Sequence, residues 1–544
     1  MQARSPGRAS SQTGSKAPVS WRELERRMCH DQNQGVSGRS AKTAGFWLAL
    51  SISVIFLLVT RQHAWSVPQI DWDEGTRMSI ASSLNHGRTL YVDAWDHHTF
   101  LDILFFQQFF RLLPCASVPL AVRLCNGAIV LALCMLVHRG VTKASGSSAW
   151  GLGATTVCAY LFGRGWALSS YGEFYHSLPV ALAFYLYLHC PRTSARFFCA
   201  GVLFGLAFFT KQTAAIDLGA FVVMVVLSRR SSEEASSRVN SAIGVLAWCL
   251  AGFLVVMLAS ASYFAIHGSL REAAYMIFVD PLTYSTGGSA QETVVRYGQA
   301  LLQLCGAAMR VNWVVTAILV ASLVLIAVRQ GDQGRLSASA RLAWAAFLWL
   351  FVDMAGLMLV GRFYPHYLIQ LIVPASVAST FVLSSVKQGF QGVATYVLFV
   401  VLLAQSALSP AVEWPEVAQG KWDEVNEIVG FLRANTKPEE GVFLYREPML
   451  CIYFLAERFP PTKVFMDDQF LQQNKDGPAL LAEAMTSLRQ HPPKFIVMGE
   501  SPEWLEKTRI PEIDSFISAS YEVKTNFGIH KVFTLRHGTV SFNP

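Results

Sequence analysis

Two acidic groups, the second followed by histidines, lie in the first long polar segment of the chain. The first is Asp71-Trp72-Asp73-Glu74 and the second is Asp93-Ala94-Trp95-Asp96-His97-His98, both after the apolar run 44–60. Carboxylates and imidazoles are costly at a bilayer surface unless water or a charged ligand compensates them. The two groups therefore indicate chemistry on a substrate that is presented at one face of a membrane.

Further polar residues stand at the ends of later apolar runs. They are Arg164, Tyr171, Glu173, Lys211, Arg362, His366 and Tyr367. A carboxylate can act as a general base, cations can bind phosphate, and aromatic rings can cover sugar faces. If the runs bring these residues together at one face, they would form a site for an anionic, sugar-like ligand.

The composition requires a membrane protein, because 52% of the 544 residues are hydrophobic and only 15% are charged, against about 25% charge in a soluble protein. Apolar runs recur that are each long enough to cross a bilayer. The fold class that we predict is a polytopic α-helical membrane protein of about 11 spans. The predicted spans are 44–60, 118–138, 148–163, 173–190, 196–210, 213–228, 242–266, 311–328, 341–360, 366–385 and 391–409.

The distribution of Lys and Arg predicts the orientation of these spans. With the basic tail 1–43 inside, the other basic loops also face inside, as the positive-inside rule requires. The segments 61–117, 267–310 and everything after 410 then face outside. The stretch 98–113 is short and carries Asp102 and Arg111, so we assign it to a juxtamembrane helix. Counting it as a span would place the later basic loops outside.

Three parts of the chain follow from this topology. Residues 1–43 form a disordered, basic cytoplasmic tail. Residues 44–410 form the transmembrane catalytic domain, with 61–117 as its outer catalytic loop. Residues 411–544 form a small soluble α/β domain on the outer face, with helices over 422–434 and 480–489 and strands over 441–445, 494–498, 521–524 and 531–535.

Four stretches, in this order, resemble the GT-C superfamily of integral-membrane glycosyltransferases. They are Asp73-Glu74-Gly75 with Asn85-x-Gly87, Leu90-Tyr91-x-Asp93 and Asp96-His97-His98; Ser170-Tyr171-Gly172-Glu173; Gly205 to Gln212; and Gly361 to Tyr367 with Pro374. The pattern is most similar to the family 39-like bacterial enzymes, which include protein mannosyltransferases and aminoarabinose transferases. One departure is that Thr99-Phe100 follow the acid–histidine step, where the family usually has proline.

The resemblance implies a GT-C-like fold and a defined reaction. A sugar would move, with inversion, from a polyprenyl-phosphate donor to a glycan, lipid or protein acceptor on the outer face. Asp73 would be the catalytic base, with Glu74 orienting it or binding the acceptor. Lys211, Arg362 and His366 would bind the donor phosphate. The remaining substrate-binding residues would be Asp93, Asp96, His97, Glu173 and Tyr367.

Cofactors, partners and location follow from the same resemblance. No cofactor is required if charged side chains neutralise the phosphate, although Asp96 and His97, with His98, could bind a divalent metal. We expect as partners a polyprenyl-phosphate-linked sugar, the acceptor and the lipid bilayer, and no nucleic acid. We expect a bacterial inner membrane, with the N-terminus cytoplasmic and the C-terminal domain periplasmic.

Other interpretations stay open. Asp73 and Glu74 could cap an interfacial helix, Lys211 could extend to the bilayer interface, and Arg362 could contact lipid headgroups. The protein could be a protein O-mannosyltransferase, which shares the donor and differs in its acceptor. It could also be a transporter or flippase of lipid-linked solutes, or a scaffold without catalytic activity. Transporters carry ionisable groups near the bilayer midplane, whereas the acids here lie in a loop.

Overall fold

The computed structural model describes most of the chain. The described residues are 43–61, 64–65, 67–69, 71–190, 193–227, 235–281, 290–332, 338–360, 364–408, 422–471, 476–499 and 509–536. The predicted tail, apart from residue 43, lies outside these ranges, as do Arg362 and the predicted domain boundary near 410. Contacts divide the chain into Met1–Leu48 and Ala49–Pro544. The described part of the first unit, 43–48, begins the helix Thr43–Arg61, and the site described below lies in the second unit.

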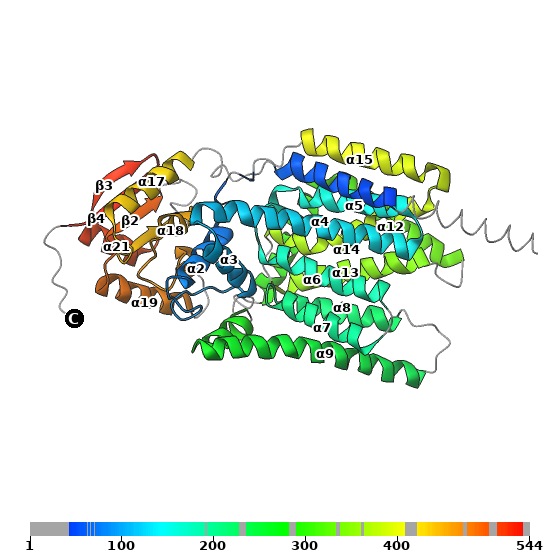
Figure 1. Ribbon diagram of the computed structural model, residues 1–544, viewed down its shortest axis with the longest axis horizontal. Helices are drawn as coiled ribbons and strands as arrows, with labels where there is room; N and C mark the ends of the chain where they lie inside the picture. The colour runs from blue at the N-terminus through cyan, green and yellow to red at the C-terminus, as the bar shows by residue number, and fades with distance from the viewer. Residues whose placement is uncertain are drawn as a thin grey trace, which may run out of the picture. The chain divides into compact units, whose positions relative to one another are not determined.

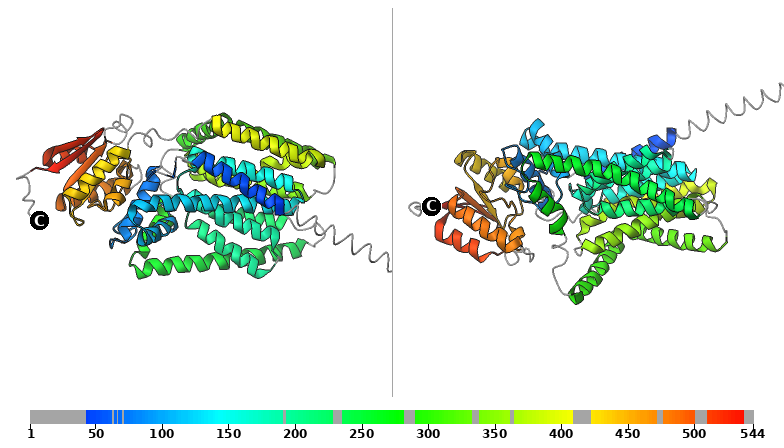
Figure 2. Two further views of the ribbon diagram at one scale, coloured as in Figure 1. Left: turned by 45° about the horizontal axis from the view of Figure 1, so that its top comes forward. Right: turned by 90° about the horizontal axis from the view of Figure 1, so that it is seen from below.

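A bundle of long apolar helices makes up most of the second unit, and several of them run nearly parallel (Figures 1 and 2). After the helix Thr43–Arg61, they are α4 (Val118–Ser145), α5 (Ser148–Phe162), α6 (Gly172–His189), α7 (Ser194–Phe208), α8 (Ala214–Leu227), α9 (Ala235–Ile266), α12 (Ala290–Asp332), α13 (Ala338–Val360), η4 (Pro365–Leu371), α14 (Ile372–Ser379), η5 (Thr380–Ser385) and α15 (Gln391–Leu408).

Each predicted span contains helical structure among its described residues. Among the described residues, six helices are long and apolar enough to cross a membrane, and three shorter apolar helices accompany them. A multi-pass helical membrane protein is thereby confirmed, while the count of about 11 spans stays a prediction.

The predicted outer loop 267–310 is largely helical. α10 (Leu270–Ala274) leads into the π-helix η3 (Tyr275–Val279), and α12 already begins at Ala290. The backbone of α12 leaves helical geometry at Asn312, where φ is −129° and ψ is 35°, so a separate helical segment precedes the predicted span. This segment is rich in Ala, Gln and Leu, which favour a helix whether or not it crosses a membrane.

Glycines allow α7 and α9 to approach closely. A Cβ atom on Gly201 would lie 1.9 Å from the carbonyl oxygen of Cys249, and one on Gly252 would lie 2.0 Å from that of Phe198. Small residues of this kind are typical of helix contacts inside membranes, because they let two backbones pack directly. The contact packs the middle of α7 on α9, and the turn that follows α7 carries Lys211.

The first outer segment contains two short helices, α2 (Trp72–Leu84) and α3 (Leu101–Leu112). The side chain of Asp71 caps α2 by accepting a hydrogen bond from the backbone N–H of Asp73 (2.9 Å), a role that Asp commonly plays at a helix start. α3 has 12 residues and is therefore about 18 Å long, too short for a hydrocarbon core of about 30 Å. This agrees with its assignment to a juxtamembrane helix.

A four-stranded sheet lies near the C-terminus, as the sequence predicts. Its strands are β1 (Val442–Tyr445), β2 (Phe495–Gly499), β3 (Tyr521–Phe527) and β4 (His530–Leu535), in the order β1-β2-β4-β3. β1 pairs with β2 in parallel, and β4 is antiparallel to both β2 and β3. The accompanying helices are α17 (Trp422–Asn435), α18 (Cys451–Ala456), η7 (Asp467–Leu471), α19 (Asp476–Gln490) and α21 (Pro511–Ser520).

The loop between β1 and α18 binds the segment that carries α2. The Ser79 hydroxyl donates to the carbonyl of Leu450 (2.8 Å), and the Gln69 amide donates to that of Pro448 (2.7 Å). The Gln69 side-chain oxygen in turn accepts from the N–H of Cys451 (2.7 Å). Because α2 also packs on the helical bundle, most of its residues are buried. Its first turn is therefore held from two sides.

Candidate active site

The first turn of α2 presents Asp73 to the histidines of the following loop. Its Oδ2 atom lies 4.0 Å from Nε2 of His98, and 13% of its side chain is exposed. His98 Nδ1 lies 2.7 Å from Oδ1 of Asp96, and the His97 and His98 rings are 3.9 Å apart. The structure thus brings Asp73 beside the Asp96-His97-His98 step that the sequence singled out.

A second group of predicted residues comes from three elements of the bundle. The Lys211 ammonium lies 2.6 Å from Oε1 of Glu173, at the start of α6, and 4.3 Å from the ring centroid of Tyr367 in η4. His366, also in η4, has its Nε2 4.0 Å from the same Glu173 oxygen. The His366 ring stacks on Tyr171 at 4.0 Å and on Tyr364 at 5.5 Å. These contacts fix a carboxylate, an ammonium and an imidazole together.

The two groups act on each other electrostatically through Asp73. Burial raises the pKa of Asp73, Asp96 and Glu173 raise it further, and Arg77 and His366 oppose the rise. Burial and the neighbouring Asp73 likewise raise the pKa of Asp71. Loss of hydration disfavours the charged carboxylate. Asp73 is therefore a stronger proton acceptor, once ionised, than an ordinary aspartate.

The histidines of the loop are shifted in the opposite direction. Burial lowers the pKa of His97 well below the usual range, and the neighbouring His98 lowers it further. Burial also lowers the pKa of His98 well below the usual range, with Arg77 as the next cause. Both rings are therefore neutral at pH 7. Neutral imidazoles can accept protons or hydrogen bonds, and they are also the form that binds metal ions.

A buried arginine is the site feature that sequence reasoning missed. Arg77 lies one turn after Asp73 on α2, and its Nε atom is 3.3 Å from Oδ2 of Asp102 in α3. Burial raises the pKa of Asp102 to about 7, against the opposing effect of Arg77. The spacing of Asp73 and Arg77 by four residues places both on one helix face, and that spacing was the signal available in the sequence.

Two predicted residues lie away from this group. Glu74 is fully buried, and both its oxygens are bound by Arg123 of α4, with Nη2 to Oε2 at 2.6 Å. Its Oε1 also accepts from the N–H of Ser170 (3.0 Å). Asp93 is exposed and accepts from the N–H of Thr89 in its own loop (2.9 Å). Since consecutive helix residues point in different directions, Glu74 points to Arg123 of α4, whereas Asp73 points to His98 of the loop.

A third ionisable cluster lies inside the bundle and was not predicted. His176 Nε2 of α6 is 2.8 Å from Oδ2 of Asp217 in α8, and the Trp349 indole of α13 donates to Oδ1 of Asp217 (2.8 Å). Asp353 also shares a hydrogen bond with Asp217. A partner for His176 could not be identified from the sequence, because Asp217 and Asp353 lie inside long apolar runs on other helices.

The loop residues fit a divalent metal. Asp96, His97 and His98 each offer a ligand atom, and these atoms all lie within 4.8 Å of one another. Asp96 Oδ2 is buried and accepts no hydrogen bond from the described residues. A carboxylate with two neutral imidazoles is a donor set that suits zinc or manganese.

The cluster has the parts that transfer of a glycosyl group from a phosphate needs. Asp73 can accept a proton, the Lys211 ammonium can interact with a leaving phosphate, and Tyr171, Tyr364 and Tyr367 supply aromatic faces. Each part comes from a different element, and Glu173 connects two of them. The arrangement is therefore able to act on a sugar that is linked to phosphate.

Comparison with known proteins identifies the fold. No family profile and no curated sequence matches the chain. The structure of ArnT from Cupriavidus metallidurans bound to undecaprenyl phosphate is similar with a TM-score of 0.55 and 14% identity, over 90% of this chain and 98% of that one. AglB oligosaccharyltransferase from Archaeoglobus fulgidus, in complex with an inhibitory peptide and a dolichol-phosphate, gives 0.52 and 11%, over 91% and 75%.

A second Archaeoglobus fulgidus oligosaccharyltransferase structure, tethered with an acceptor peptide, also has a TM-score of 0.52 with 11% identity, over 83% of this chain and 69% of that one. At these identities the likeness establishes the fold. The chain has the fold of the GT-C superfamily of glycosyltransferases, as its sequence motifs predict.

Proposed function

We propose that this protein is a membrane glycosyltransferase that moves a sugar from a polyprenyl-phosphate donor to an acceptor hydroxyl, with inversion. The observation that carries the proposal is the position of Asp73. It is a buried carboxylate with a raised pKa, 4.0 Å from a neutral histidine, in a chain with a GT-C fold. The undecaprenyl phosphate in the ArnT structure and the dolichol-phosphate in the AglB structure support a polyprenyl-phosphate donor.

The reaction needs one base. The acceptor oxygen attacks the anomeric carbon while its proton passes to Asp73. The bond from the anomeric carbon to the phosphate oxygen breaks, and its electrons leave with polyprenyl phosphate. General-base catalysis of this kind contributes about 10²–10⁴-fold to the rate. Arg77, bound to Asp102, lies one turn away and would stabilise the ionised form of Asp73.

Lys211 is the donor-phosphate residue that the contacts support best. An ammonium has three N–H donors, and Glu173 accepts at 2.6 Å, so the same group can also donate to a phosphate oxygen. His366, held between Tyr171 and Tyr364, is the second candidate, and Arg362 is proposed from its sequence motif alone. Glu173 and Tyr367 would position Lys211.

Glu74 is proposed as a positioning residue, because Arg123 binds both its oxygens. Asp96 and His97 would contact the acceptor or, with His98, hold a divalent metal. Such an ion would supply positive charge for the phosphate. The Lys211 ammonium provides that charge in part, so we propose that a metal is dispensable.

We propose that the reaction takes place on the outer face of a bacterial inner membrane. The argument is the positive-inside rule, which places the basic loops in the cytoplasm and the segment 61–117 with the C-terminal domain in the periplasm. The acceptor would then be a glycan, lipid or protein of the cell envelope.

The test is a transfer assay in purified membranes with a panel of radiolabelled polyprenyl-phosphate sugars. Wild type is compared with Asp73→Asn and with Glu272→Gln, an exposed acid of α10 outside the cluster. We expect transfer by wild type and the Glu272 variant, and a loss of about 10²–10⁴-fold in Asp73→Asn. Equal transfer by Asp73→Asn would remove Asp73 from catalysis.

The buried His176–Asp217 pair favours one alternative, a transporter or flippase of lipid-linked solutes. Ionisable groups inside a helix bundle commonly mark transport pathways. Proteoliposomes that move a lipid-linked solute, with loss of movement in Asp217→Asn and no sugar transfer from any donor, would replace the enzyme with the transporter. A protein O-mannosyltransferase would instead transfer mannose to Ser/Thr peptides in the same assay.

A further inference from the structure

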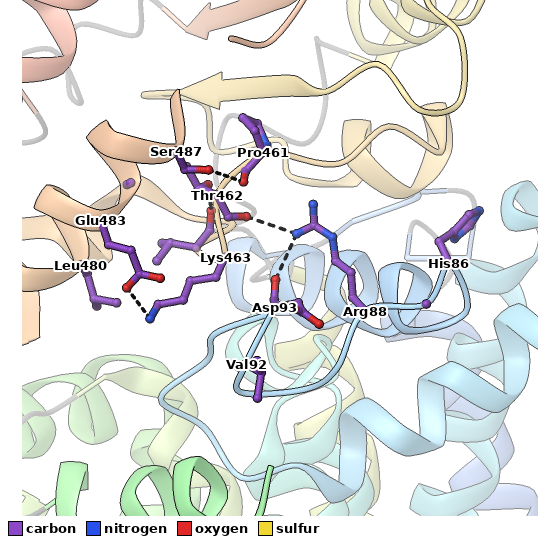
Figure 3. A pocket seen from close by; sticks show the side chains of 13 residues that line it. His86, Arg88, Val92, Asp93, Pro461, Thr462, Lys463, Leu480, Glu483 and Ser487 are labelled. Atoms are coloured by element: carbon purple, nitrogen blue, oxygen red, sulfur yellow. Dashed lines mark hydrogen bonds and ion pairs between the residues drawn. The ribbon is translucent and has the colours of Figure 1, made fainter. Parts of the chain in front are cut away.

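A cavity lies between the first outer segment and the C-terminal domain (Figure 3). It is separate from the candidate active site around Asp73 and Lys211. Its volume is about 470 Å³. One side is formed by the turn that includes Arg88 and Asp93, and the other by the chain around Lys463 and by the face of α19 that carries Glu483 and Ser487. Neither the catalytic base nor the donor-phosphate residues line this space.

One wall of the cavity continues into the active site. The N–H of Trp95 donates to the carbonyl of Lys463 (2.8 Å), and Trp95 pairs with Val464 in a parallel bridge. Asp96 is the next residue after Trp95. An extended chain spans at most about 3.6 Å per residue, so the Cα atoms of Asp93 and Asp96 are at most about 11 Å apart. A short oligosaccharide can cover that separation.

Arg88 joins the two walls. Its guanidinium donates to the carbonyls of Asp93 (3.1 Å) and Thr462 (3.2 Å) and also to that of Pro460. It also lies over the Phe465 ring, 5.3 Å from the centroid. These contacts connect the C-terminal domain to the loop that leads to Asp96. The cavity is therefore built by contacts from both sides, with its walls held in register.

The charges around the cavity are balanced. Lys463 pairs with Glu483 at 2.6 Å, and Arg88 is matched by the exposed carboxylate of Asp93 in the same lining. A site for a phosphate or a sulfate would carry an excess of cations. An acyl or prenyl chain would need a predominantly apolar lining, whereas side chains that donate and accept hydrogen bonds predominate in Figure 3. The lining suits a neutral ligand with many hydroxyl groups.

Two apolar side chains in the lining also suit a sugar ligand. Val92 and Leu480 line the cavity from opposite walls. A sugar ring has C–H faces as well as hydroxyl edges, so it can contact apolar carbons and donors at once. Val92 is 41% exposed, which leaves its methyl groups accessible to a ligand.

We infer that this cavity is an acceptor subsite for a neutral glycan, whose terminal hydroxyl extends along the Trp95–Asp96 segment towards Asp73. The inference rests on the proposed function, because it needs a glycosyl transfer at Asp73. It gives the C-terminal domain a role in choosing the acceptor.

The test measures binding and transfer separately, with the full chain in lipid nanodiscs. Binding is measured by calorimetry with mannotriose and triacetylchitotriose as neutral probes, trigalacturonate as an anionic probe, and a Ser/Thr peptide. Glu483→Trp and Val92→Trp place a large ring in the cavity from exposed positions. Ala482→Trp is the matched control, because Ala482 is exposed on the same helix and outside the lining.

We expect a neutral trisaccharide to bind wild type and Ala482→Trp equally, and to bind the two cavity variants at least about tenfold more weakly. Asp73→Asn should keep this binding and lose transfer. Binding of trigalacturonate or the peptide in preference to both neutral probes, no binding of either neutral probe, or unchanged binding in both cavity variants would overturn the subsite. Absence of transfer in wild type, with neutral binding intact, would instead overturn the proposed function.

Discussion

Two faces of α2 carry neighbouring acids in opposite surroundings. On one face, Glu74 has no exposed surface, and Arg123 binds both its oxygens. On the other, burial raises the pKa of Asp73 against the opposing charge of Arg77, and the nearby Asp96 and Glu173 add to the rise. The residues are adjacent and chemically alike, so the difference comes entirely from what each face meets.

This difference separates a structural acid, Glu74, from the acid that we propose as the catalytic base, Asp73. A buried carboxylate that an arginine binds through both oxygens links two helices, and removing one partner leaves the other charge buried and unpaired. A carboxylate whose loss of hydration outweighs the nearby positive charges is kept ready to take a proton. The bound face of α2 thereby fixes the orientation of the reactive face.

The largest effect on stability is expected from Glu74→Ala, on the face of α2 that Arg123 binds. Glu74→Ala leaves Arg123 buried without its carboxylate, and breaking a buried pair in this way costs about 3–5 kcal/mol of stability. Thermal unfolding of the detergent-solubilised protein measures the loss. Glu272→Ala, at an exposed position, is the control. An unchanged unfolding temperature in Glu74→Ala would mean that the pair does not hold α2.

Replacing both partners should cost less than replacing one. Glu74→Leu with Arg123→Leu removes both charges, and buried pairs exchanged for apolar residues are often neutral. The N–H of Ser170 would still lose its acceptor, which costs about 1–3 kcal/mol. The double variant should therefore unfold at a higher temperature than either single leucine variant. If the two single losses simply add, the residues do not interact.

The sequence predicted the reactive face better than the bound one. Glu173, Lys211 and His366 stand at the ends of apolar runs, and Asp73 lies in the polar segment after the first run. The lengths of the spans and the charges of the loops therefore predict that all four reach the same face. Arg123 lies inside the run 118–138, and hydropathy does not indicate which residue on another element pairs with it. The roles of the residues on the reactive face stay predictions.

The same reasoning applies to the fold. The apolar helices of the bundle and the four strands were predictable, because periodicity and apolar length are local properties of the chain. The helix that begins at Ala290 was missed, because the prediction identified helices in this region by apolar length alone. The contact between Arg88 and the segment 460–462 could not be predicted, since it joins residues far apart in the sequence.

On the reactive face, Asp73→Asn should lower activity without lowering stability. The folded-state pKa of Asp73 is raised, so its ionised form destabilises the fold at a pH above the ordinary carboxyl range. Asn carries no charge and removes this cost. At neutral pH the variant should unfold at the same temperature as wild type or higher, and any advantage should vanish in acid. A large loss of stability at pH 7 would show that Asp73 is structural, as Glu74 is.

The smallest effect that we expect is a shift in the pH dependence of the transfer rate in Asp71→Asn. The transfer rate should rise with pH as Asp73 loses its proton, with an inflection above the ordinary carboxyl range because the pKa of Asp73 is raised. The charge of Asp73 raises the pKa of Asp71, and two carboxylates repel each other reciprocally. Asn at position 71 removes that repulsion and still caps the helix, since Asn and Asp are equally good caps.

The rate profile of Asp71→Asn should therefore move to lower pH, with little change in its maximum. Rates measured from acid to alkaline pH, with Glu272→Gln as the control, give the position of the inflection. A shift to higher pH, or none, would mean that the charge of Asp71 does not reach the catalytic base. The carboxylates that raise the pKa of Asp73 would then be Asp96 and Glu173, and Asp96→Asn would move the profile in place of Asp71→Asn.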